Sequence, residues 1–192
     1  MTDAAHRRGL VMFTREEPVV GAHRMSGKPP EPDAAAREAL PEFYAAGGVA
    51  SAMLFLDPQG TEEKCLSLVW LKLGSHFTVP RHHHTGDCLY YVAAGEVHLG
   101  SQVITAGGGF FAPSAAPYTY KAGPDGAEVL EFRGALHPID TELLDNDWDG
   151  ILETARERKA DWARELVPFA RWARTTEVPF DISEPGGDKQ PV

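Results

Sequence analysis

Cysteine and long hydrophobic runs are both scarce in this sequence. Its 192 residues include two cysteines, Cys65 and Cys88, which are too few for a disulfide framework and typical of a reducing compartment. The apolar run near the start, residues 10–13, is shorter than the core of a signal peptide, and no run approaches the roughly 18 residues that span a bilayer. We therefore expect a cytoplasmic protein that does not associate with membranes.

Basic residues are also few. Eighteen Lys and Arg against 28 Asp and Glu give a formal net charge of −10, which disfavours binding to nucleic acid or to an anionic membrane surface. Hydrophobic residues (43%) and charged residues (24%) occur at frequencies typical of soluble globular proteins. The length suits one domain with a core of its own.

Glycine (19) and proline (15) are abundant, and the segments between them divide the chain into three parts. We expect an N-terminal arm over residues 1–48, a β-barrel over 49–135 and a helical tail over 136–192. In the arm, the proline-rich tract 28–32 excludes regular structure. Asp33 is expected to cap a short helix that ends around Pro41, and Gly47 and Gly48 to close a further helical remnant.

The middle of the chain has the pattern of an all-β fold. Short runs rich in apolar, β-branched and aromatic residues alternate with turns rich in Gly, Pro, Asp and Ser. The expected strands are residues 51–56, 64–73, 88–93, 96–100, 110–113, 118–122 and 128–133. Strands this short and closely spaced indicate a sandwich or barrel, and the absence of a long intervening helix argues against a parallel α/β sheet.

After residue 139 the apolar period becomes helical. Steps of four and three residues predict one stripe along a C-terminal α-helix, interrupted by a charge at Lys159. Asp145 or Asp147 would cap this helix, and Pro168 would kink it near its end. We expect the stripe to cover a face of the barrel or a dimer partner. Its members are Trp148, Leu152, Ala155, Lys159, Trp162, Leu166, Phe169 and Ala173.

Two histidines stand out because of their spacing. In a strand, His82 and His84 point to the same side and His83 to the other. Two imidazoles on one face can hold a single cation, and neutral imidazole suits Fe, Zn, Cu or Ni.

The residues around this pair resemble the first metal motif of the cupin superfamily. The match is Pro80-x-His82-x-His84, followed by position 88 and by Gly95. In cupins the metal ligands of this motif are two histidines and a glutamate. Here Cys88 occupies the position of the glutamate.

A second segment resembles the other cupin motif. It has Gly107, then Pro113 six residues later, and then Tyr118 at the position of the last histidine ligand. The resemblance covers about residues 50–133. It implies a small jelly-roll β-barrel, often dimeric, with a metal inside the barrel. With the flanking segments, the expected fold is all-β: a cupin-type jelly-roll barrel with a short N-terminal helical arm and a C-terminal α-helix.

Cys88 and Tyr118 therefore replace two of the usual cupin ligands in the predicted site. We expect one divalent transition metal, with iron first and Zn, Ni, Mn or Cu as alternatives, bound by His82, His84 and Tyr118. Tyr118 and Cys88 are the candidate catalytic residues, as a phenolate and a thiolate if the metal lowers their pKa. Alternatively, Cys88 is a small buried hydrophobic side chain. Cysteine dioxygenases are similar in carrying a cysteine at this position.

Other residues are weaker candidates for the metal. A structural or solvent-facing role is the preferred interpretation for His76, His98, His137 and Glu131. Asp87 would replace the missing carboxylate only with a local bulge, because its strand parity is opposite to that of Cys88. Aromatic residues with polar tips suit a small organic ligand. The residues expected to line the substrate pocket are Trp70, Tyr90, Phe111, Tyr120 and Phe132.

The leading hypothesis is a metal-binding cupin that acts on a small organic molecule as a dioxygenase-like oxidoreductase. Two alternatives remain open: a non-catalytic barrel that binds a small ligand, and a metal-assisted isomerase, cyclase or lyase. Motifs for a nucleophilic triad, a phosphate loop or a dinucleotide site are absent from the sequence. The flanking arms favour a homodimer.

Overall fold

The computed structural model describes residues 11–17, 19–20, 31–58, 60, 65–134 and 141–167. The predictions for His137, Pro168, Phe169 and Ala173 lie outside the described residues. None of the helices in the described part of the chain is long and apolar enough to cross a membrane.

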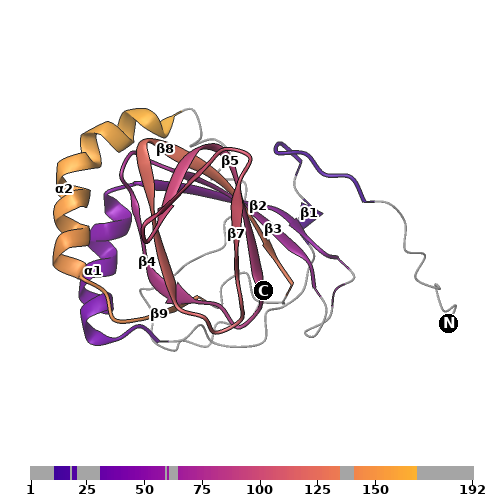
Figure 1. Cartoon of the computed structure of the whole chain (residues 1–192), viewed down its shortest axis with the longest axis horizontal. Helices are drawn as coiled ribbons and strands as arrows, with labels where there is room; N and C mark the ends of the chain where they lie inside the picture. The colour runs from indigo at the N-terminus through magenta and orange to yellow at the C-terminus, as the bar shows by residue number, and fades with distance from the viewer. Residues whose placement is uncertain are drawn as a thin grey trace, which may run out of the picture.

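One curled sheet contains the nine strands of the described residues (Figure 1). The path β1-β2-β3-β8-β4-β9 forms one side, and β5 pairs with β6, β7 and β8. Every pairing is antiparallel except that of β1 with β2. The strands are β1 (Val19–Val20), β2 (Val49–Leu56), β3 (Ser67–Leu73), β4 (Thr78–His83), β5 (Cys88–Leu99), β6 (Gln102–Thr105), β7 (Gly109–Ala112), β8 (Tyr118–Arg133) and β9 (Glu142–Leu143).

Strand β8 joins the two sides of the barrel. Its second half pairs with β3 and β5, and its first half pairs with β4. Between the halves the chain turns at Gly123–Gly126, where the partners of Ala122 and Ala127 on β5 are two residues apart. Gly126 has φ +73°, and a Cβ added to it would lie 2.4 Å from the carbonyl oxygen of Leu73. This corner therefore needs glycine.

Several expected strands are longer or more continuous than predicted. Residues 88–93 and 96–100 form the single strand β5, and residues 118–122 and 128–133 form the single strand β8. The glycine-containing segments between them are irregularities inside a strand rather than turns between strands. The short strands β1, β6 and β9 had no counterpart among the predictions.

Two helices flank the barrel on the same side, opposite β1 (Figure 1). Helix α1 (Ala34–Ala45) begins at the predicted cap, where the Asp33 carboxylate accepts a hydrogen bond from Ala36 N at 2.7 Å. It does not end at Pro41 as expected but continues through it. The missing proline N–H removes one hydrogen bond, and burial of Leu40 and Phe43 against the core offsets that loss.

Helix α2 (Trp148–Glu165) is capped by Asp147. Its apolar stripe is buried while Lys159 is exposed, as predicted. The stripe packs mainly against α1, where Trp148 contacts Phe43, and against the segment before β4. Trp162 donates from Nε1 to the carbonyl oxygen of Ser75 at 2.8 Å and packs on the ring of Phe77. The predicted all-β fold with a short N-terminal helix and a C-terminal helix is confirmed.

Candidate metal and ligand site

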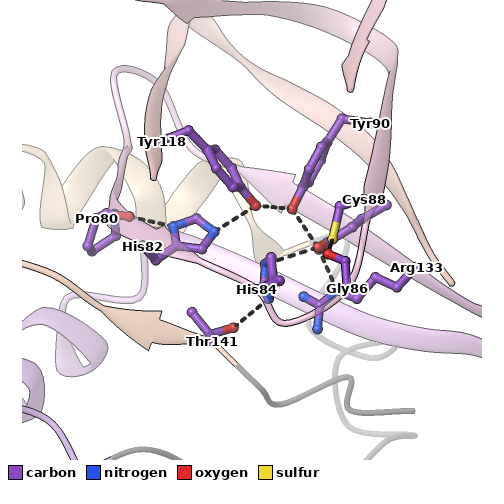
Figure 2. A network of polar contacts seen from close by, with 10 residues as sticks. Pro80, His82, His84, Gly86, Cys88, Tyr90, Tyr118, Arg133 and Thr141 are labelled. Atoms are coloured by element: carbon purple, nitrogen blue, oxygen red, sulfur yellow. Dashed lines mark hydrogen bonds and ion pairs between the residues drawn. The ribbon is translucent and has the colours of Figure 1, made fainter. Parts of the chain in front are cut away.

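A cavity of about 520 Å³ opens into the barrel between α1 and strands β2, β3 and β4. Its walls are mostly apolar, with side chains such as Leu40, Phe43, Met53 and Phe77. Most polar residues of the lining form a group that we call the floor: His82, His84, Tyr90, Tyr120, Glu131, Arg133 and Thr141. Figure 2 shows His82, His84, Tyr90, Arg133 and Thr141 of this group close together. The apolar walls suit the apolar part of a small organic ligand, and the polar floor suits its polar or reacting groups.

His82 is buried at the end of β4, and both of its ring nitrogens contact protein groups. Nδ1 lies 2.7 Å from the Pro80 carbonyl oxygen, which can only accept, so Nδ1 carries a proton. Burial lowers the pKa of His82 to about 4, so the ring is neutral at pH 7. Nε2 therefore accepts a hydrogen bond from the Tyr118 hydroxyl at 2.9 Å.

Two tyrosine hydroxyls extend this contact to a buried carboxylate. Tyr118 OH lies against Tyr90 OH, and Tyr90 OH donates to Glu131 Oε1 at 2.5 Å. Burial raises the pKa of both tyrosines, so both are phenols at neutral pH. Either hydroxyl can be the donor in the hydrogen bond between Tyr118 and Tyr90.

Glu131 is held by a buried cation. Arg133 Nε donates to Glu131 Oε1 at 2.6 Å, and both side chains are buried on β8. Burial alone would raise the pKa of Glu131, but the charge and the hydrogen bond of Arg133 lower it below its usual value. The carboxylate is therefore ionised at neutral pH.

Three potential metal ligands meet beside this ion pair. One ligand atom each of His84, Cys88 and Glu131 lies within 4.8 Å of the other two, and all three residues are buried. His84 Nε2 is 3.4 Å from Glu131 Oε1, and Thr141 Oγ1 is 3.4 Å from His84 Nδ1 (Figure 2). The imidazole thus turns its Nε2 toward the cluster.

This donor set fits a divalent transition metal. Ligand atoms bound at about 2.0–2.3 Å to one ion lie roughly 3–4 Å apart, so side-chain shifts of about 1 Å would close the cluster. Imidazole, thiolate and carboxylate together suit Zn and iron. Because Arg133 already balances the charge of Glu131, a Cys88 thiolate would offset one of the two charges of a bound divalent ion.

The structure brings the predicted ligands His82, His84 and Tyr118 together. The rings of His82 and His84 lie 5.0 Å apart, and Tyr118 contacts His82 directly. Cys88 lies at the same floor. The sequence analysis treated Glu131 as a weak candidate for a metal ligand. The signal that could have identified it is a carboxylate two residues before an arginine in an otherwise apolar strand.

The remaining weak candidates lie elsewhere. His98 pairs with Glu96 near the surface. His76 adopts φ +57° in the turn before β4. Asp87 accepts a hydrogen bond from Ser114 N at 2.8 Å. The structural or solvent-facing roles preferred for His76 and His98 agree with these positions.

The predicted pocket aromatics separate into two groups. Tyr90 and Tyr120 line the cavity. Trp70 and Phe132 instead belong to a second apolar cluster on the outer face of the sheet, and Phe111 is exposed. These three do not line the cavity, which corrects the predicted interior placement.

The reason is a change of strand parity. In β8 the inward residues are even-numbered up to Ala122 and odd-numbered from Ala127 onward, because the Gly123–Gly126 corner intervenes. Phe132 therefore points outward. In β7, Phe110 faces inward and stacks on Tyr90, with ring centroids 4.5 Å apart. The sequence alone did not distinguish Phe110 from Phe111.

Comparison with known proteins finds similarity only among solved structures. No protein-family model and no curated protein matches the chain. An RmlC-like cupin from Shewanella frigidimarina is 24% identical over 48% of this chain and 80% of its own, with a TM-score of 0.40. KdgF from Halomonas sp. is 22% identical over 46% and 82%, with a TM-score of 0.37. The DMSP lyase DddQ from Ruegeria pomeroyi is 16% identical over 52% and 53%, with a TM-score of 0.44.

These similarities concern the fold. The barrel of this chain is defined by its own strand pairings. Similarity at this level transfers neither a ligand nor an activity.

Proposed function

We propose that this cupin-type barrel binds one divalent transition metal at the floor of its cavity and acts on a small organic molecule as a dioxygenase-like oxidoreductase. The observation that carries the proposal is the buried cluster of His84, Cys88 and Glu131, whose ligand atoms lie within 4.8 Å of one another. The cavity above it has apolar walls and room for a small organic molecule.

His84, Cys88 and Glu131 would hold the metal, with His82 and Tyr118 beside them as the further predicted ligands. Iron is the first expectation, and Zn, Ni, Mn and Cu are alternatives. When bound, the metal supplies a Lewis acid and, if it is redox-active, the electrons for a reaction with dioxygen.

The protein's own groups have defined tasks. Arg133 fixes the position of the Glu131 carboxylate, and Thr141 orients the His84 ring. Tyr118 and Tyr90 connect His82 Nε2 to the Glu131 carboxylate by hydrogen bonds. The apolar walls surround the polar floor.

The test is metal stoichiometry in untagged protein after reconstitution with Fe, Mn, Ni, Cu and Zn. One equivalent of one of these metals is expected, and substoichiometric metal with all of them would contradict the proposal. An oxygen electrode then tests the reaction class with candidate substrates. Metal-dependent turnover without oxygen uptake would replace the dioxygenase by an isomerase, cyclase or lyase.

One observation favours the non-catalytic alternative. The polar floor also has partners without a metal, because His82 contacts Pro80 and Tyr118, and Glu131 contacts Arg133 and Tyr90. A barrel that merely binds a small ligand predicts that the double variant H82A/H84A retains its ligand affinity. The metal proposal predicts that this variant loses metal binding.

A further inference from the structure

One buried hydroxyl in the cavity has no hydrogen bond within the protein. Tyr120 of β8 lines the cavity and is only 3% exposed, yet no group among the described residues forms a hydrogen bond with its hydroxyl. The oxygen is also not among the unpartnered polar atoms that the described part of the protein encloses completely. The hydroxyl therefore opens into the cavity. Buried polar groups normally have partners, so its partner is expected to come from a ligand.

The other tyrosine hydroxyls at the floor already have partners. Tyr118 OH contacts His82 Nε2 at 2.9 Å and also contacts Tyr90 OH. Tyr90 OH donates to Glu131 Oε1 at 2.5 Å. A ligand could hydrogen-bond to either of these hydroxyls only in competition with existing contacts, whereas Tyr120 can donate without breaking one.

Tyr120 lies at the edge of the floor, next to the apolar walls. Its register partner on β4 is Val79, whereas Tyr118 is paired with His82. Residues two apart in a strand project to the same side, and the rings of Tyr118 and Tyr120 are parallel within 7°, with centroids 6.4 Å apart. The ring of Phe110 lies 5.5 Å from that of Tyr120. These ring contacts fix the direction of the Tyr120 hydroxyl.

The lining offers little compensation for a charged ligand. Among the described residues that line the cavity, Glu131 and Arg133 are the only Asp, Glu, Lys or Arg side chains, and they pair with each other at 2.6 Å. Burying a charge without an opposite charge beside it is strongly unfavourable. Strands β2 and β3 contribute apolar side chains to the walls, such as Met53 and Leu71. The space between the walls and Tyr120 therefore suits an uncharged group.

We propose that Tyr120 binds the substrate by donating a hydrogen bond to an uncharged oxygen atom, and that the substrate is an uncharged, mainly apolar carbonyl compound, ether or alcohol. A buried donor that only a ligand can satisfy favours molecules with an acceptor oxygen and disfavours hydrocarbons, which leave it unpaired. This inference deepens the proposed function and rests on its cavity as the binding site. It does not depend on the metal.

Ligand-detected NMR titrations of the full, metal-free chain test the inference with three molecules of similar shape: acetophenone, ethylbenzene and benzoate. Acetophenone has an acceptor oxygen that ethylbenzene lacks, and benzoate adds a negative charge. The wild type is expected to bind acetophenone about fivefold more tightly than ethylbenzene, because one hydrogen bond distinguishes them. Benzoate should bind at least about tenfold more weakly than acetophenone, because its charge has no free counter-charge in the lining.

The variant Y120F removes the hydroxyl and keeps the ring. It should weaken acetophenone binding about fivefold and change ethylbenzene binding by no more than about a factor of two. Y91F is the matched control, since it makes the same change at a tyrosine that faces away from the cavity and is 44% exposed. It should leave the affinities for all three molecules unchanged. Circular dichroism and retained ethylbenzene binding show that the cavity of Y120F is intact.

Equal affinities of the wild type for acetophenone and ethylbenzene, or no binding of acetophenone up to about 10 mM, would overturn the inference without any variant. Unchanged acetophenone binding in Y120F would overturn the role of Tyr120, and benzoate binding as tight as that of acetophenone would overturn the uncharged class. Metal stoichiometry is measured separately. A protein that shows the expected ligand preferences but binds no metal would keep this inference and lose the metal proposal, and the reverse pattern would do the opposite.

Discussion

The Nε atom of Arg133 lies 2.6 Å from Oε1 of Glu131, and both side chains are buried where β8 passes the cavity floor. The pair places one ionised carboxylate beside the neutral hydroxyls of Tyr90 and Tyr118. Burying both charges is costly, and each depends on the other for compensation. This relationship determines which groups at the floor are charged before any ligand arrives.

Replacing Arg133 by a neutral residue should therefore destabilise the folded protein strongly. We expect R133M to lower the free energy of unfolding of the metal-free protein by about 3–5 kcal/mol, because Glu131 would remain as an uncompensated buried charge. The double variant E131Q/R133M should recover part of this loss. Urea denaturation provides the measurement.

The control for this prediction is the exposed ion pair between Arg156 and Glu42, whose Nε–Oε1 distance is the same 2.6 Å. R156M should change stability little, since solvent screens exposed pairs. Equal effects of R133M and R156M would show that burial does not govern the strength of these pairs.

The pH dependence of stability should report the burial of His82. The pKa of His82 is about 4 in the folded protein against 6.5 for the free side chain, so between these values the unfolded chain binds more protons. Stability from this group is fully present above pH 6.5 and is lost as the pH falls toward 4. Between pH 7 and pH 5 the loss is about 2 kcal/mol in the metal-free protein.

The variant H82N isolates this contribution. Its free energy of unfolding should fall less steeply than that of the wild type over the same pH range, whatever its absolute stability. Parallel curves for the two proteins would mean that His82 titrates normally in the folded state.

Two motif glycines should differ in their tolerance of alanine. Both have positive φ, +70° for Gly95 and +91° for Gly107, so each substitution carries backbone strain of about 1–2 kcal/mol. A Cβ at Gly95 would also lie 2.2 Å from the Gly126 carbonyl oxygen, whereas at Gly107 it would meet nothing within 4 Å. G95A should therefore be less stable than G107A by at least about 2 kcal/mol.

Thermal or urea denaturation of the two variants decides this point. Similar stabilities would mean that the β8 corner can move away from β5 at little cost.

Much of the fold could be predicted from local patterns. The Asp33 cap, the stripe on α2 and the common orientation of His82 and His84 depend on short-range periodicity, and the structure contains all three. The continuation of α1 through Pro41 could not be predicted in this way. It depends on burial against elements that are remote in the sequence.

The site was harder to predict because the alternation of inward and outward side chains changes register at an irregular corner in a strand. Counting from Tyr118 places Phe132 inside and Glu131 outside, and the Gly123–Gly126 corner reverses both. The carboxylate missing from the position of Cys88 is thus supplied from the far half of β8. That relationship is visible only once the pairing of β5 with β8 is known.

The most direct test of the metal site is the spectrum of the Co²⁺-loaded protein. Cys88 and Cys65 are both buried, but only Cys88 belongs to the candidate cluster. We expect a thiolate-to-metal charge-transfer band in the wild type and in C65S, and its loss in C88S, since thiolates bind such ions directly. The absence of the band in the wild type, or its retention in C88S, would contradict a metal bound by His84, Cys88 and Glu131.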